Sequence, residues 1–484
     1  MKKNFFILNS FYSVLPGFFS ILVSIFSIPI FLKILGVAYF GQYLIQNIFI
    51  SLGYLLNFGL FKIIILRSNI KDESKICSQN TYLFNLNLLL SFFFSSILMI
   101  ILFFIIKYYY LETLNLLFNK YIYFGLILTS LNFSVESLLK INRKFKILSL
   151  YNFFFNSVAF SLPAFFLFAK TKLIENHEIL FYPEQIFFLV IWIKFFVVLI
   201  LYIYFIKSNI LKIFNHNDYL NNYRRLMSDI LYSASLGVSF FFNNIIDKFF
   251  VKLALGNENL AIYSVPQQIA AKSTILNSAL ISVFFPEVIK KTGSKKFFFF
   301  KFVINIILIF SGVLILCTFP FLKMFLKIWL GDIYNLKYLL LLKIFLFYSL
   351  FASINSGISA YLESKKQIKN NSLIEILTFF ILIFFFLICY KEKILEYFAY
   401  SILLKELLTF VIKGLKYYKI FSKLKKQILF LVLISIFFLV SIIFNSLYLD
   451  IFISFVLLFN LLIIYRNILI KYFSKFPIKH KKYV

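Results

Sequence analysis

The sequence reads Leu35-Gly36-Val37-Ala38-Tyr39-Phe40-Gly41-Gln42-Tyr43 where one apolar segment ends and the next begins. A corresponding place 220 residues later reads Leu255-Gly256-Asn257-Glu258-Asn259-Leu260-Ala261-Ile262-Tyr263. Leu, Gly and Tyr keep their positions in both stretches. Further along, three more residues match at the same offset, namely Leu56, Asn57 and Leu60 with Leu276, Asn277 and Leu280. Because these matches keep the same register along two helix-length apolar segments, they indicate an internal duplication.

The composition places the chain in a membrane. Of its 484 residues, 62% are hydrophobic and only 14% are charged, whereas soluble domains are about half apolar and a quarter charged. A bilayer accommodates such a chain, because a spanning helix needs roughly 20 mostly apolar residues. The apolar windows predict an all-α polytopic protein with about fourteen transmembrane helices, at 10–32, 41–64, 83–106, 121–139, 147–169, 184–206, 229–252, 260–285, 297–321, 337–361, 370–390, 395–414, 427–447 and 450–470.

The offset of the repeat predicts how these helices are grouped. It equals six predicted helices, an even number, so the two copies cross the membrane in the same direction. We therefore expect two six-helix lobes related by a pseudo-two-fold axis along the membrane normal, as in transporters with parallel repeats. The predicted units are an N-terminal lobe, a cytoplasmic linker, a C-terminal lobe, two extra transmembrane helices and a basic cytoplasmic tail, at 1–206, 207–228, 229–414, 427–470 and 471–484.

The net charge of +31 is spread between the apolar segments and is not gathered on a soluble domain. This distribution argues against a nucleic-acid partner and follows the positive-inside rule. With the N-terminus in the cytoplasm, the predicted cytoplasmic segments hold roughly three times as many Lys and Arg residues as the outer ones. Both termini are therefore expected in the cytoplasm. The basic cytoplasmic segments are 140–146, 290–296, 365–369, 413–426 and the tail.

Several kinds of chemistry have no signature in the sequence. Cys77, Cys317 and Cys389 are scattered, and the three His residues fall in predicted loops or the tail, so neither a metal site nor a cofactor is expected. A phosphate-binding loop of the G-x-x-x-x-G-K-[ST] type does not occur. The first apolar segment is too long for the core of a signal peptide and is expected to be the first membrane helix. We therefore do not expect an enzyme.

Polar residues recur at helical spacing on four of the predicted helices. Residues four apart share a helix face, and a charge at mid-bilayer is costly unless it faces protein or water. The candidate substrate-binding residues of a central cavity are Asn57 and Lys62 on helix 41–64, Asn243, Asp247 and Lys248 on helix 229–252, and Gln268, Lys272 and Asn277 on helix 260–285. A stripe of Ser13, Ser20, Ser24 and Ser27 runs along helix 10–32 beside Pro16 and Gly17.

Each of these features has a structural alternative. Lys272, near the middle of its predicted span, is expected to attract an anionic group. Asp247 either carries a coupled proton or pairs with a lysine for structural reasons alone. Lys248 and Lys252 either face the cavity or extend to the outer interface. The serine stripe either lines a wet wall or allows close helix packing.

Two sets of motifs resemble a known family. The first comprises Ile28-Pro29-Ile30, Leu35-Gly36 and Gly41-Gln42-Tyr43. The second comprises Asn243-Asn244-Ile245-Ile246-Asp247-Lys248, Leu255-Gly256, Ala261-Ile262-Tyr263-Ser264-Val265 and Phe285-Pro286. Both are similar to the polysaccharide transporter family, the bacterial flippases of O-antigen and exopolysaccharide repeat units. That family belongs to the multidrug/oligosaccharidyl-lipid/polysaccharide exporter superfamily.

The resemblance implies a substrate and a location. The implied substrate is an undecaprenyl-diphosphate-linked oligosaccharide that alternating access moves across the bacterial inner membrane. Implied partners are membrane lipid, a proton or other coupling ion, and the polysaccharide polymerase and chain-length proteins.

Three rival functions are open on the sequence. A lipid II flippase and a multidrug/cation antiporter belong to the same superfamily, and the antiporter is expected to have an acidic cavity. A membrane-embedded polysaccharide polymerase is expected to have a long periplasmic loop, whereas the longest predicted here is about fourteen residues.

Overall fold

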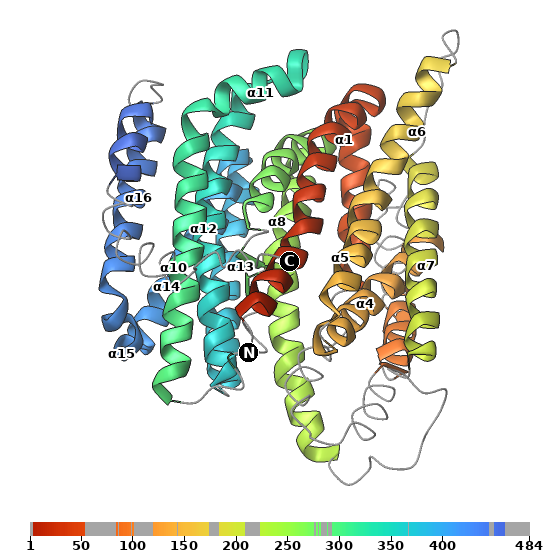
Figure 1. Ribbon diagram of the computed structural model, residues 1–484. Helices are drawn as coiled ribbons and strands as arrows, with labels where there is room; N and C mark the ends of the chain where they lie inside the picture. The colour runs from red at the N-terminus through yellow and green to blue at the C-terminus, as the bar shows by residue number, and fades with distance from the viewer. Residues whose placement is uncertain are drawn as a thin grey trace, which may run out of the picture.

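The fold is all-helical in the part of the chain that the computed structural model describes (Figure 1). This part comprises residues 3–53, 84–85, 87–97, 99–100, 120–142, 144–173, 183–208, 223–274, 277–278, 280–281, 288, 293–365, 367–444 and 450–459. Seven helices among these residues are long and apolar enough to cross a membrane, or eight if the bent pair Tyr418–Leu424 and Gln427–Ile442 is one span. The predicted total of fourteen extends over residues outside the described ranges and stays a prediction.

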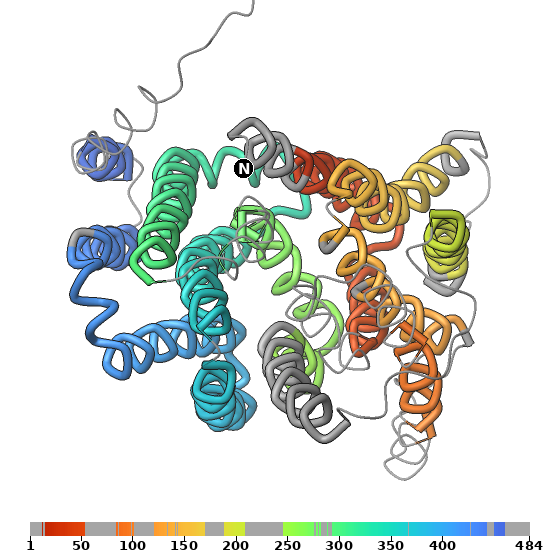
Figure 2. The backbone as a smooth tube through the Cα atoms, turned by 60° about the horizontal axis from the view of Figure 1, so that its bottom comes forward, coloured from red at the N-terminus to blue at the C-terminus, as the bar shows by residue number. Residues whose placement is uncertain are grey.

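The helices form two groups, and α8 of the second group lies at the junction with the first (Figures 1 and 2). The first group comprises α1 (Lys3–Ser51), α4 (Lys120–Ile141), α5 (Phe145–Asn152), the π-helix η3 (Phe153–Val158), α6 (Ala159–Leu173) and α7 (Pro183–Lys207). The second comprises α8 (Tyr223–Lys272), α10 (Gly293–Thr318), α11 (Leu322–Leu330), α12 (Leu336–Ser364), α13 (Ile368–Glu392), α14 (Leu395–Lys416), α15 (Tyr418–Phe421) and α16 (Lys425–Phe444). Short 3₁₀ turns link some of them, at Phe319–Phe321 (η5), Gly331–Ile333 (η6) and Ser422–Leu424 (η7).

Helix α8 begins at Tyr223, so residues 223–228 of the predicted linker are helical. After Lys272 the amides of Ser273 and Thr274 bond carbonyls only three residues back, and the described residues 277–278 and 280–281 are helical again. The predicted end of this helix at 285 lies outside the described residues.

Both repeated glycines break a helix with a single residue. Gly36 has φ 77° and ψ 162° inside α1, and Gly256 has φ 84° and ψ −176° inside α8. This backbone region is open essentially to glycine alone. The turns expected after the first and seventh helices are therefore confirmed, and the shared conformation supports the duplication.

Gly41 brings α1 and α8 into backbone contact. A Cβ atom added at Gly41 would lie within van der Waals overlap of the backbone carbonyl of Asn257. Within the described residues, α1 and α8 share the most extensive helix–helix interface. The second arm of α1 thus packs beside the Gly256 break, and the repeated segments meet each other where the two helix groups join.

A Gly41→Ala substitution is expected to lower stability by about 2 kcal/mol or more, because the added methyl group meets backbone that cannot rotate away. The thermal unfolding midpoint of the purified protein in detergent measures this effect. Gly414→Ala is the matched control, since the nearest atom to its new Cβ lies at 3.4 Å. That control is expected to leave the midpoint unchanged or to raise the stability by up to about 1 kcal/mol. Equal midpoints for the two variants would contradict the close packing at Gly41.

Helix α11 links the second group of helices to α1. Pro29 has no N–H to donate to the carbonyl of Ile25, four residues earlier in α1. The indole Nε1 of Trp329 donates to this carbonyl oxygen at 2.6 Å. The Trp329 ring also stacks on Phe325, with centroids 5.6 Å apart and planes at 14°. The proline thus leaves an acceptor that the tryptophan of α11 satisfies.

The pairing of Trp329 with the proline kink can be tested with a double-mutant cycle. Trp329→Phe keeps a ring to stack on Phe325 but loses the indole donor, and it is expected to cost about 1 kcal/mol. In a Pro29→Ala background the same change is expected to cost less, because the backbone N–H that alanine restores then serves the Ile25 carbonyl. Unfolding midpoints of the four proteins give the coupling. The same loss in both backgrounds would rule out this role of Pro29.

Buried polar contacts hold the C-terminal helices on the second group. Lys343 of α12 is buried and forms an ion pair with Asp450 at 3.3 Å; it also donates to the hydroxyl of Ser441 at 3.0 Å. Gln427 donates to Asn305 of α10 at 2.6 Å. Breaking a buried ion pair by removing one partner costs about 3–5 kcal/mol. Helix α16 and the helical residues 450–459 are therefore fixed to α10 and α12.

The basic connections lie at one end of the molecule. The α4–α5, α12–α13 and α14–α15 connections are at the end opposite α11 (Figure 1). They fall in the segments 140–146, 365–369 and 413–426, which were predicted to share one side of the membrane. The helix directions in the described part are therefore consistent with the predicted alternation.

Candidate functional site

A polar cavity of about 560 Å³ lies between α1, the α4–α6 segment and the end of α8. The cavity is lined by Tyr12, Pro16, Gly17, Ser20, Val23, Ser24, Glu136, Lys140, Leu148, Ser149, Asn152, Asn156, Phe160, Gln268, Ala271, Lys272 and Ser278. Besides Tyr12, ten of these side chains carry a hydroxyl, an amide or a charge. The cavity therefore suits a hydrophilic ligand. Residues of both helix groups contribute to it.

Lys272 is the cationic residue on the side of the cavity that the end of α8 forms, which we call the C-terminal wall. It is the last residue of α8, and its Nζ donates to the Ser20 hydroxyl of α1 at 2.6 Å. The negative end of a helix dipole favours a lysine at this position. None of the described carboxylates forms an ion pair with Lys272. Its charge is therefore balanced within the described residues only by dipoles, which leaves it able to attract an anion.

The serine stripe of α1 contributes to the wet wall. Ser20 and Ser24 line the cavity, together with Pro16 and Gly17. The Ser24 hydroxyl donates to the Ser20 carbonyl at 2.8 Å. Ser27, one turn further on, is buried instead. Both alternatives therefore apply to parts of the stripe: Ser20 and Ser24 line the cavity, whereas Ser27 is packed against other helices.

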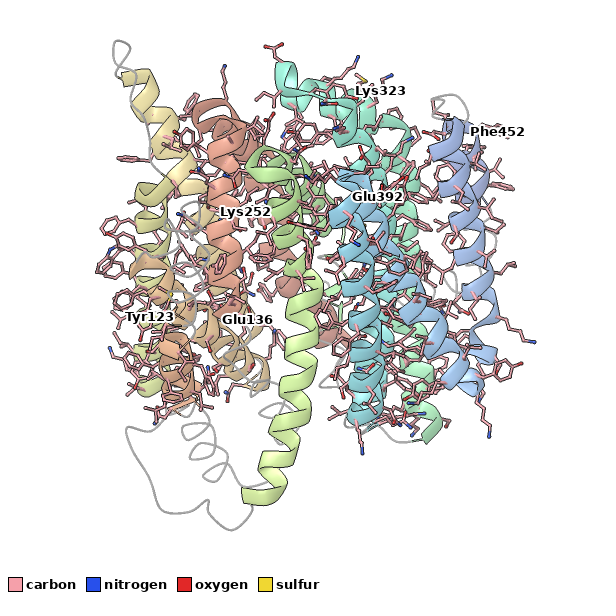
Figure 3. The ribbon with its side chains drawn as sticks, turned by 180° about the vertical axis from the view of Figure 1, so that it is seen from behind. Tyr123, Glu136, Lys252, Lys323, Glu392 and Phe452 are labelled. Carbon is pink, nitrogen blue, oxygen red and sulfur yellow. The ribbon has the colours of Figure 1, made fainter. Side chains whose placement is uncertain are left out.

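The opposite wall contains a neutralised ion pair. Glu136 and Lys140 of α4 pair at 2.8 Å, and Asn132 donates to the other Glu136 oxygen at 3.3 Å. The Tyr151 hydroxyl in turn donates to the Asn132 carbonyl oxygen. Figure 3 shows Glu136 in the half of the molecule away from Lys323 of α11. Because Glu136 is matched by Lys140, Lys272 supplies the net positive charge of the described lining.

The structure brings together two of the eight predicted site residues at the cavity, Gln268 and Lys272. Asp247 and Asn277 are buried inside the second helix group, and neither they nor Lys248 line the cavity. Asn57 and Lys62 lie outside the described residues. Asn243 lies in α8, and only its backbone is described. Helical spacing alone did not show which face of each helix a neighbouring helix covers.

Asp247 is the centre of a buried polar cluster. Its Oδ2 accepts from the Tyr263 hydroxyl at 3.0 Å and from Gln267 Nε2 at 2.7 Å. The Tyr263 ring packs edge-on against Phe345 of α12, with centroids 5.1 Å apart. These bonds join the two arms of α8 across the Gly256 break. Asn277 has a similar structural position, since its amide donates to the hydroxyls of Ser311 and Ser353 at 2.8 and 2.9 Å.

A second cluster of charges lies among α12, α13 and α14. Glu375 pairs with Lys413 at 2.7 Å and with Lys405 at 3.5 Å, and Lys405 also pairs with Glu406 at 2.8 Å. Asn355 donates to Glu406 at 2.6 Å. Two carboxylates and two ammonium groups neutralise one another here, as buried charges require. A metal-binding group of three or more His, Cys, Asp or Glu side chains does not occur among the described residues.

Sequence reasoning missed the wall formed by α5 and η3. Ser149, Asn152 and Asn156 line the cavity, yet they fall in a Phe-rich segment and were not among the predicted site residues. Their spacing of three and four residues is a signal that was available. The π-helix that places them on one face has no comparable sequence signature.

Glu375→Gln is expected to lower the free energy of unfolding by about 3 kcal/mol, because it leaves two buried lysines with one carboxylate. Glu392→Gln, at the exposed end of the same helix, is the matched control and is expected to have no effect. Adding Lys413→Met to Glu375→Gln is expected to recover part of the loss. Thermal unfolding in detergent measures all three variants. A Glu375→Gln protein as stable as the control would show that the cluster does not stabilise the fold.

Comparisons with known proteins identify the fold. No protein-family model matches the sequence, and no curated protein matches it. Among solved structures, the chain is similar to the outward-facing conformation of a multidrug resistance MATE family transporter of the MOP superfamily. The TM-score is 0.62 at 14% identity, over 87% of this chain and 96% of that chain. The similarity to the lipid II flippase MurJ in its inward closed conformation has a TM-score of 0.61 at 16% identity, over 96% of this chain and 100% of that one.

A third solved structure has a reversed pocket. It is a MOP superfamily transporter from Pyrococcus furiosus Vc1, whose reverse polarity of the binding pocket suggests a different function. The TM-score is 0.62 at 13% identity, over 86% of this chain and 96% of that chain. The three neighbours are transporters. The chain shares the fold of these solved structures.

Proposed function

We propose that this protein, with its MOP superfamily transporter fold, is a flippase for undecaprenyl-diphosphate-linked oligosaccharides. Flipping of a repeat unit from the cytoplasmic to the outer leaflet of the bacterial inner membrane would use alternating access. The proposal places both termini and the basic connections in the cytoplasm, following the positive-inside rule. It also places the α11 end of the molecule on the outer side.

The observation that supports this function best is Lys272 in the polar cavity. An ammonium group without a described carboxylate partner attracts an anion strongly in a medium of lower dielectric constant than water. A diphosphate carries the negative charge that would balance this lysine. The hydroxyl and amide groups around the lysine suit the sugar that the diphosphate carries.

The alternatives within this fold differ in the ligand that the cavity would bind. A cation or drug antiporter is expected to present a free carboxylate. The acid among the described lining residues, Glu136, is already paired with Lys140. A lipid II flippase shares the diphosphate, and the similarity to MurJ covers nearly the whole of both chains. Lipid II is therefore the second candidate substrate.

Asp247 is our candidate for coupling to a proton gradient or the membrane potential. The carboxylate is fully buried, and the hydrogen bonds described above come from the neutral donors Tyr263 and Gln267. The ammonium of the next residue, Lys248, also interacts electrostatically with this carboxylate. Glu375 and Glu406 differ, because each forms a close ion pair with a lysine, at 2.7 and 2.8 Å. Within this proposal, the polysaccharide polymerase and chain-length proteins are partners in the same assembly process.

Lys272→Gln is expected to reduce flipping of a diphosphate-linked oligosaccharide at least tenfold, because it removes the charge that attracts the diphosphate. The measurement is the transfer of a fluorescent oligosaccharide lipid between leaflets of proteoliposomes that contain the purified protein. Lys272→Arg keeps the positive charge and is expected to retain more transfer than Lys272→Gln.

Lys391→Gln is the control for this experiment, because Lys391 is exposed at the end of α13. It is expected to transfer the lipid at the rate of the unchanged protein. Wild-type transfer of lipid II in preference to the oligosaccharide lipid would favour the second candidate. Transport of a cationic drug with no transfer of either lipid would overturn the flippase function.

A further inference from the structure

A π-helix, η3, aligns the residues of the α5–α6 segment that line the cavity. In an α-helix, a row of residues four apart drifts by about 40° at each step, because one turn holds 3.6 residues. Leu148, Asn152, Asn156 and Phe160 form such a row and all line the cavity. The wider turn of η3, Phe153–Val158, offsets this drift. The wall therefore presents one straight line of side chains to the cavity.

The π-helix is supported by a neighbouring helix. Phe155 is buried and does not line the cavity, and the Lys194 ammonium of α7 lies 5.0 Å from its ring centroid. A cation over an aromatic face is attracted by the ring quadrupole. This contact gives the mid-membrane Lys194 a role in fixing the wall. Because π-helices are rare and often occur at functional sites, a supported one beside a cavity indicates a binding function.

The wall formed by Ser149, Asn152 and Asn156 is neutral and able to form hydrogen bonds. The amide groups can both donate and accept, and so can the hydroxyl. The Oδ1 atom of Asn152 is buried and has no hydrogen-bond partner among the described residues. An acceptor of this kind is costly to leave unpaired, so a donor supplied by a ligand would satisfy it. A sugar hydroxyl is such a donor.

The two sides of the cavity thus have different chemistry. The C-terminal side carries the charge of Lys272, whereas the α5–η3 wall has no charged side chain and Glu136 beside it is neutralised by Lys140. A substrate with one anionic part and one hydroxyl-rich neutral part would match both sides at once. We infer that Ser149, Asn152 and Asn156 form a subsite for the neutral sugar next to the diphosphate and set which headgroup is accepted. This inference rests on the proposed flippase function.

Binding of two probe lipids to the full-length protein in nanodiscs tests the subsite. One probe is an undecaprenyl-diphosphate-linked oligosaccharide, and the other is undecaprenyl diphosphate without sugar. Asn152→Leu with Asn156→Leu keeps the volume of the side chains and removes their hydrogen bonds. It is expected to weaken binding of the glycosylated lipid about tenfold, with binding of the bare diphosphate unchanged within about twofold. Lys272→Gln is expected to weaken binding of both lipids.

Two single variants keep the test independent of folding. Asn156→Leu changes a side chain that is exposed in the cavity, so it is expected to fold and to show part of the same selective loss. Phe154→Leu, at an exposed position of the same π-helix that does not line the cavity, is the matched control and is expected to bind both lipids normally.

The outcomes separate the subsite from the flippase function. Suppose that the Asn variants weaken binding of both lipids equally, or of neither lipid, while Lys272→Gln still weakens binding of both. The subsite is then overturned and the flippase function stands. If the unchanged protein binds neither lipid, the flippase function fails, and the subsite fails with it.

Discussion

The contact between Gly41 and the backbone of Asn257 is the constraint on which the arrangement depends. It brings α1 and α8 together without an intervening side chain. The two helices also meet where Lys272 at the end of α8 donates to the Ser20 hydroxyl of α1. The cavity lies beside the same pair of helices, so its two chemically different sides face each other across this junction.

Charges inside the membrane are handled in two ways. In the second helix group, Lys405, Lys413, Glu375 and Glu406 neutralise one another and leave no net charge. Such a cluster fixes α13 against α14 and offers little to a passing substrate. Lys272 is instead surrounded by dipoles and is open to the cavity. Whether a buried charge is available to a ligand therefore depends on its ion-pair partners, and the number of buried charges alone does not show it.

The sequence predicted the parts of this molecule that depend on local properties. Hydropathy located the membrane helices, and the matched Leu-Gly-x₆-Tyr pattern located both glycine breaks. Two of the predicted site residues, Gln268 and Lys272, line the cavity, although Lys272 lies at the end of α8 and not at the middle of a helix. Residues such as Asn277 looked equally polar, but they are buried by α10 and α12, which only packing could reveal. The π-helix and the bond from Trp329 to Ile25 depend on partners far away in the chain and left no pattern to read.

The one-residue breaks at Gly36 and Gly256 leave no slack between the arms of α1 and α8. The two arms of each helix are therefore joined by one residue and not by a loop. In α1 the break separates the arm that carries Ser20 from the arm that carries Gln46, which is buried in the first group. In α8 it separates the arm that carries Asp247 from the arm that ends at Lys272. A tilt of either cavity-lining arm would therefore act directly on an arm that is packed inside a helix group.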